Sequence, residues 1–209
     1  MRIDRQADVA LPVLIASLQS KDRLVQLGAI SALSQMKGAA TPAVESLKGL
    51  LANKDSQVKL AAAIALWQIN PSDDAAVKAF TSALQDEHAG VRMDASRALR
   101  YAGKPSEDVL AALNNALRDK DDYVSHEAAI AMSHLGPRAI NLLIGALRDP
   151  QVTVRRRAAE ALGSAGSESR DAVQPLINAL KDEDPVVRSF AAMSLQEIDP
   201  VAAKNAGVP

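Results

Sequence analysis

A pattern of apolar residues recurs six times along this chain at a nearly constant interval. Its most regular member is a valine, and successive valines are 33, 33, 33, 30 and 33 residues apart: Val25, Val58, Val91, Val124, Val154 and Val187. A leucine stands seven residues before each valine, an alanine four residues after it, and a leucine or methionine eight residues after it. Periods of this length are typical of stacked arrays, in which each repeat packs mainly against its neighbours. The interval therefore predicts a repeat array rather than a globule with a single core.

Two helical patterns alternate within each repeat. In the fifth repeat, Ile140, Leu143 and Leu147 are spaced by three and four residues, which places them on one side of a first helix. A second helix is expected to begin three residues before the valine, where an aspartate can accept hydrogen bonds from free backbone N–H groups: Asp22, Asp55, Asp121 and Asp184. The single 30-residue interval predicts a tight turn at Gly136-Pro137 rather than a domain boundary.

The fifth and sixth repeats resemble a known family. The segments AINLLIGALRDPQVTVRRRAAEALGSAG (residues 139–166) and VQPLINALKDEDPVVRSFAAMSL (residues 173–195) are similar to HEAT-like repeats of the phycobilisome-lyase type. The resemblance extends over residues 9–199. It implies an α-solenoid whose second helices line a concave inner face. It implies no single activity, because such repeats serve scaffolds, lyase subunits and a di-iron hydroxylase.

We therefore expect an all-α fold, a right-handed α-solenoid of six two-helix HEAT-like repeats without a sheet. The expected repeats cover residues 9–37, 42–70, 75–103, 107–136, 137–166 and 170–199 and form one solenoid domain, followed by a C-terminal tail at residues 200–209. Ile3-Asp4 matches Ile198-Asp199 at the end of the last repeat. Residues 1–8 are accordingly expected to be the tail of a preceding repeat, in a segment of a larger bacterial protein. A short N-terminal cap is the alternative.

Composition narrows the range of partners. The formal net charge of -1 gives no reason to expect nucleic acid or an anionic membrane as a partner. The absence of cysteine excludes disulfides and thiolate metal sites.

No apolar run approaches the roughly 20 residues that cross a bilayer, and the N-terminus lacks the apolar stretch of a signal peptide. We expect a cytoplasmic protein, and the sequence does not predict its oligomeric state.

One short string carries a possible catalytic motif. His126-Glu127 resembles the His-Glu motif of deoxyhypusine hydroxylase, which is built from the same repeats and needs several such pairs around two irons. The equivalent positions of the other repeats hold no second pair: Leu27-Gly28, Leu60-Ala61, Met93-Asp94, Arg156-Arg157 and Ser189-Phe190. We therefore expect no metal, no cofactor and no catalysis, with His126 and Glu127 at a solvated helix start.

The residues that break the repeat indicate an interaction surface. At 100° per residue, positions +2, +6 and +9 after the valine lie at about 200°, 240° and 180°, opposite the core. In the second repeat these are Leu60, Ile64 and Trp67, which form an apolar stripe on a face that is expected to be exposed to solvent. Neighbouring repeats add the rest of the predicted partner-binding set: Leu27, Met93, Arg97, Arg100, Ile130 and Arg156. Packing within the solenoid, or contact with a missing domain, are the alternatives for this stripe.

These observations predict a non-catalytic scaffold for protein–protein interaction. Its concave face would bind a peptide or helix with apolar and acidic residues. Arg155 is expected to pair with acidic residues of adjacent turns, while Arg156 and Arg157 are expected to be free to bind a partner. The alternatives are a lyase-like or chaperone-like subunit that holds a client protein, and a relative of the metal-dependent hydroxylases.

Overall fold

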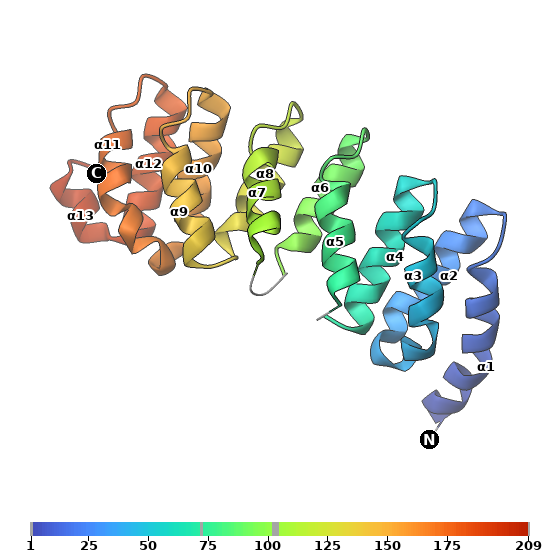
Figure 1. The fold of residues 1–209 in the computed structure, drawn as a ribbon. Helices are drawn as coiled ribbons and strands as arrows, with labels where there is room; N and C mark the ends of the chain where they lie inside the picture. Colours follow the sequence, from blue (N-terminus) through green and yellow to red (C-terminus); the bar gives the residue numbers. More distant parts are fainter. Residues whose placement is uncertain (1, 72, 102–104, 209) are drawn as a thin grey trace. The chain divides into compact units, whose positions relative to one another are not determined.

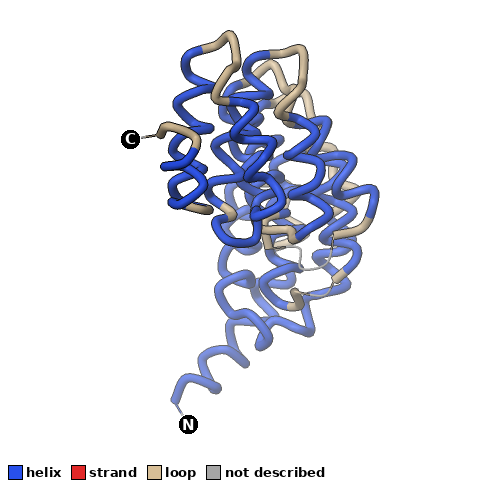
Figure 2. Tube along the Cα trace, turned by 90° about the vertical axis from the view of Figure 1, so that its left-hand side faces the viewer, coloured by secondary structure: helices blue, strands red, loops and turns tan. Residues whose placement is uncertain are grey.

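The structure, a computed structural model, describes residues 2–71, 73–101 and 105–208, with side chains from residue 9 onward. Figures 1 and 2 show that these residues form helices joined by turns, with no β-strand in the described ranges. The backbone contacts divide the chain into two compact units, unit 1 at residues 1–98 and unit 2 at residues 99–209. The all-α prediction is confirmed, whereas the prediction of one solenoid domain over residues 9–199 stays a prediction.

Unit 1 contains the first three repeats. Its elements are α1 (Arg2–Ser17), α2 (Arg23–Met36), a 3-10 helix (Lys37–Ala43), α3 (Val44–Leu50), α4 (Ser56–Ile69), α5 (Asp74–Ala83) and α6 (Ala89–Leu99), the last residue of which belongs to unit 2. The first helices α1 and α3 pack on the second helices α2 and α4, which also pack on each other. Helix α1 passes without a break through the predicted boundary between residues 8 and 9. The assignment of residues 1–8 to a preceding repeat or a cap stays a prediction.

Unit 2 contains the last three repeats and one further helix. Its elements are α7 (Glu107–Ala116), α8 (Asp122–Ser133), α9 (Pro137–Ala146), α10 (Val152–Ser164), a 3-10 helix (Gly166–Ala172), α11 (Val173–Ala179), α12 (Pro185–Ile198) and α13 (Pro200–Asn205). The second helices α8, α10 and α12 pack in series. Gly136, with φ +79°, makes the predicted tight turn between α8 and α9. The predicted tail holds a helix, α13, which packs on α12 and begins where Asp199 caps it and Pro200 takes its first position.

The helix starts and the core follow the repeat. All four predicted aspartates cap their second helices by accepting from two backbone N–H groups each. The six alanines at position +4 are 3% exposed or less, and five of the six valines are equally buried.

The repeat pattern predicts that each of the six valines is buried, and this prediction is wrong for Val25, which is 47% exposed. The side of each second helix that carries positions 0 and +7 faces the preceding repeat: Ser194 of α12, at +7, donates a hydrogen bond to the carbonyl of Ala159 in α10. No second helix precedes α2 among the described residues, so nothing there covers Val25.

Candidate functional site

The predicted apolar surface in unit 1 is present in part. Ile64 and Trp67 of α4 are half-buried, as are Leu27 of α2 and Met93 of α6. Leu60 is only 6% exposed, so the expectation that it lies on an open surface is wrong. The four half-buried side chains, Leu27, Ile64, Trp67 and Met93, are called the apolar set below.

Stacking of the second helices explains the error at Leu60. In α10, Gly163 occupies position +9, and a Cβ built there would lie 2.4 Å from Ser194 Oγ of the next second helix. Positions +5 and +9 therefore face the following repeat, and position +2 lies close to them, at about 200° against about 180° for +9. The solvent-exposed side of each second helix lies further around the helix axis than positions +2 and +9. Position +10 of the second helix is exposed in all six repeats. The side of the second helices that carries positions +6 and +10 is called the open face below.

The Trp67 side chain contacts the core and is also partly exposed. Its ring meets Phe80 of α5 edge to face, with centroids 6.5 Å apart and an interplanar angle of 68°. Phe80 is 1% exposed, so this contact fixes the indole to the core of unit 1. Trp67 itself remains half-buried at the border of the open face. The residue therefore serves packing and still presents apolar surface.

Arg97 adds a charge to the open face of unit 1. It is exposed at position +6 of α6, and its guanidinium lies 3.5 Å from the Asp94 carboxylate on the same helix. An ion pair between two side chains that are about half exposed is weak and exchanges readily with solvent.

In unit 2 the same side of the second helices holds linked charged groups. Arg100 lies 3.5 Å from Glu127. Glu160 lies 3.4 Å from the Nδ1 of His126 and 3.0 Å from Arg157, which also contacts the His126 ring at 3.3 Å. His126 and Glu127 are half-buried. The expectation that they form a solvated helix start is therefore wrong, because contacts with adjacent repeats enclose them.

Arg155 and Arg156 both join α10 to the last repeat. Arg155 is 8% exposed and binds both oxygens of Asp182 at 2.8 and 3.0 Å, as predicted for a structural arginine. Burial opposes ionisation of Asp182, but the hydrogen bonds and charge of Arg155 together with the backbone N–H of Asp184 outweigh it and hold the pKa of that carboxyl below its usual range. Arg156 binds the two Asp184 oxygens at 2.9 and 2.5 Å and lowers the pKa of Asp184.

The prediction that Arg156 and Arg157 are free is therefore wrong. Each guanidinium already has a carboxylate partner within unit 2. Ile130, the remaining member of the predicted set, is half-buried in α8.

Sequence reasoning missed one apolar stripe. Val186, Phe190 and Met193 follow one another on α12 at positions −1, +3 and +6, and Met193 is 53% exposed. Their i, i+4, i+7 spacing is a readable signal. It was missed because positions +2, +6 and +9, which were chosen for the stripe, hold Ser189, Met193 and Gln196 in this repeat.

The described residues offer neither a metal-binding cluster nor a membrane-spanning helix. No group of three or more histidine or acidic side chains in the described ranges is arranged to hold a metal ion. None of the helices in the described part of the chain combines the length and apolar character needed to span a membrane.

Comparison with known proteins identifies the repeats. A family model described as HEAT repeats matches residues 3–67, 44–133, 77–163 and 140–206, which together cover nearly the whole chain. The chain belongs to the HEAT-repeat family. Solved structures agree: an engineered protein is 25% identical, with a TM-score of 0.56 over 94% of this chain and 97% of that one. The α-solenoid prediction is therefore confirmed.

Two other similarities are narrower. Phycocyanobilin lyase subunit alpha from Picosynechococcus sp. (strain ATCC 27264 / PCC 7002 / PR-6) is 44% identical over 66 residues, which are 28% of this chain and 24% of the lyase subunit. The match thus spans about a quarter of that relative. A designed armadillo repeat protein in complex with the peptide (KR)4 has a TM-score of 0.53 at 18% identity, covering 90% of this chain and 99% of the design, and shows the fold alone.

Proposed function

We propose that this HEAT-repeat protein is a non-catalytic scaffold that binds a segment of a partner protein on the open face of unit 1. The observation that supports this most is the apolar set itself. Leu27, Ile64, Trp67 and Met93 come from three successive second helices, and each is half-buried. An exposed apolar patch often marks an interaction site, and we propose that these four side chains form one.

The chemistry of the open face indicates the character of the partner. An apolar segment would cover Ile64 and Trp67, and an aromatic ring already fixed by packing loses little entropy on binding. An acidic residue beside that segment would compete with Asp94 for the exposed Arg97 guanidinium. In unit 2, by contrast, Arg156 and Arg157 are already paired with carboxylates and offer less to an acidic partner.

The experiment compares two positions that are equivalent in the repeat. Ile64 in unit 1 and Met193 in unit 2 both occupy position +6 of a second helix. The full chain and its Ile64→Lys and Met193→Lys variants would each be used to capture proteins from a bacterial lysate, with quantitative mass spectrometry. We expect the Ile64→Lys chain to lose a specific subset of proteins that the Met193→Lys chain retains. Equal recovery by all three chains would refute the proposed site.

A lyase-like role is the second candidate, and the local identity to phycocyanobilin lyase subunit alpha favours it. In this role the open face would hold a bilin-bearing client or the bilin itself. Titration of the full chain with phycocyanobilin, followed by visible absorption, separates the two roles. A saturable spectral change that Ile64→Lys abolishes would favour the lyase-like role over the scaffold.

A further inference from the structure

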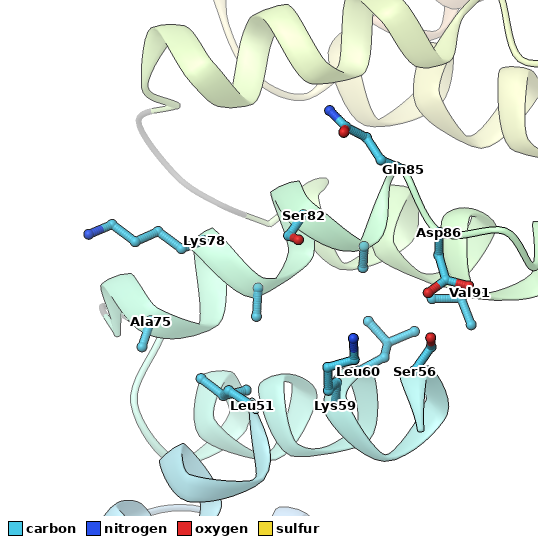
Figure 3. A pocket seen from close by; sticks show the side chains of 12 residues that line it. Leu51, Ser56, Lys59, Leu60, Ala75, Lys78, Ser82, Gln85, Asp86 and Val91 are labelled. Atoms are coloured by element: carbon cyan, nitrogen blue, oxygen red, sulfur yellow. The ribbon is translucent and has the colours of Figure 1, made fainter. Parts of the chain in front are cut away.

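A pocket of unit 1 lies between its second and third repeats. It has a volume of about 610 Å³ and opens between α4 and α5, next to the start of α6. Figure 3 shows Lys59 and Leu60 rising from α4 toward α5, with Ser56 and Asp86 facing each other at one end. Small and aliphatic side chains make up much of the remaining wall, among them Ala79 of α5.

The repeat explains why space is left here. Lys59 stands one residue after its valine, the position that Arg155 holds in the fifth repeat. There Arg155 fills the gap between repeats and binds Asp182, the equivalent of Asp86. Among the described residues, the Lys59 ammonium has no hydrogen bond or ion pair, and so the corresponding gap stays open.

A small side chain on α5, Ala79, also borders the gap. Ala79 lies twelve residues before its valine, and the equivalent residue of the fifth repeat is Leu142. The methyl group of alanine leaves volume that a leucine side chain would fill. The pocket thus lies beside the Lys59 and Ala79 side chains, between the second helix of the second repeat and the first helix of the third.

The charges at the pocket are unbalanced. Asp86 is half-buried, which opposes its ionisation, but it accepts hydrogen bonds from the Ser56 hydroxyl and the His88 backbone N–H, and its pKa lies below the usual range. The Asp86 carboxylate therefore has hydrogen-bond donors other than Lys59. Lys59 therefore presents an unmatched positive charge to the pocket, and Lys78 adds a second cation, exposed at the rim.

We propose that this pocket binds a small organic acid, with the carboxylate at Lys59 and an aliphatic chain along the alanine-lined side of α5. A carboxylate supplies the charge-assisted hydrogen bond that Lys59 lacks. The aliphatic chain gains from burial against Leu60 and Ala79. The volume falls within the range of about 300–1,000 Å³ that is typical of small-molecule sites. This site is independent of partner binding on the open face.

Sodium octanoate titrated into the full chain tests the proposal. Trp67, the only tryptophan, packs on Phe80 next to Ala79, so its fluorescence reports on this region. Calorimetry gives the stoichiometry in parallel. We expect one saturable site per chain with a Kd at or below about 1 mM, and weaker binding of octan-1-ol and of acetate, which lack the charge and the chain respectively. Absence of saturation up to about 5 mM would overturn the proposal.

Matched variants locate the ligand. Lys59→Gln should weaken octanoate binding about tenfold, the equivalent of one charge-assisted contact, whereas Lys120→Gln, an exposed lysine of unit 2, should leave it unchanged. Ala79→Leu should weaken binding, because the larger side chain narrows the alanine-lined side of α5 on which the aliphatic chain is proposed to lie. Circular dichroism confirms that each variant is folded. Equal affinities for the two lysine variants, or full binding by a folded Ala79→Leu chain, would refute the site.

Discussion

Gly163 gives the sharpest test of how successive second helices stack. A Cβ at this position would lie 2.4 Å from Ser194 Oγ and 3.0 Å from Ser194 Cβ, far inside normal contact. Ser194 is 3% exposed, and its hydroxyl donates to the Ala159 carbonyl at 2.7 Å. Gly163→Ala must therefore push the serine hydroxyl aside or move α10 away from α12.

The magnitude follows from three contributions to the free energy of unfolding. Alanine in place of a helical glycine stabilises by at most about 1 kcal/mol. Loss of the Ser194 hydrogen bond costs about 1 kcal/mol, and overpacking in a filled interface costs about 1–3 kcal/mol. We therefore expect Gly163→Ala to destabilise the protein by about 1–3 kcal/mol, although the helix propensity improves.

Urea unfolding of four chains measures the effect: the original sequence, Gly163→Ala, Ser194→Ala and the double variant. Ser194→Ala alone should cost about 1 kcal/mol. The double variant should be more stable than the sum of the single effects by about 1 kcal/mol, because the displaced hydroxyl is absent. Stabilisation by Gly163→Ala, or strict additivity, would show that position +9 does not face the next repeat.

Four further predictions concern the core, acid stability, the tryptophan and metal. Ala128→Leu should destabilise by about 1–3 kcal/mol in urea titrations through overpacking, since Ala128 is 0% exposed; a neutral result would place position +4 outside the core. Asp182 has a lowered pKa in the folded state, so its ionised form stabilises the fold above the unfolded pKa of about 4, and this contribution is lost as the pH falls through the folded pKa. Unfolding midpoints should drop in acid, and less so in Asp182→Asn; an unchanged acid profile in that variant would contradict the role of the Arg155 pair. Trp67→Ala should weaken partner binding by about 2 kcal/mol or more and cost about 1–3 kcal/mol of stability through the lost Phe80 contact, whereas a loss of stability alone would assign the ring to packing. Elemental analysis should find no stoichiometric iron or zinc, and about one metal per chain that is lost in His126→Ala would contradict this expectation.

Much of the fold could be predicted from patterns that are local in the sequence. The six-fold recurrence of leucine, valine and alanine predicted the paired helices, and the aspartates three residues before the valines predicted where four second helices begin. These signals are local, because a cap or an apolar stripe acts within one or two turns of helix. The helix at Pro200–Asn205 was missed because it lies beyond the last repeat and is too short to show a period.

The surface was harder to predict, because the helical wheel of one repeat says nothing of its neighbours. Position +2 points away from the first helix, yet Leu60 is buried because the following repeat packs close to that side. Arg156 looked free in sequence because its partner, Asp184, belongs to the next repeat, where it also caps α12. The pocket beside Lys59 lies between two repeats, and only the stacked structure shows its volume.

Photo-cross-linking tests partner binding on the open face of unit 1 most directly. A benzophenone amino acid would replace Ile64 in one chain and, in a matched chain, Met193, which holds the same repeat position in unit 2. Irradiation in a bacterial lysate, followed by mass spectrometry, identifies the proteins attached to each position. We expect a defined protein to be cross-linked at position 64 and not at position 193. The same proteins at both positions, or none at position 64, would contradict the assignment of partner binding to unit 1.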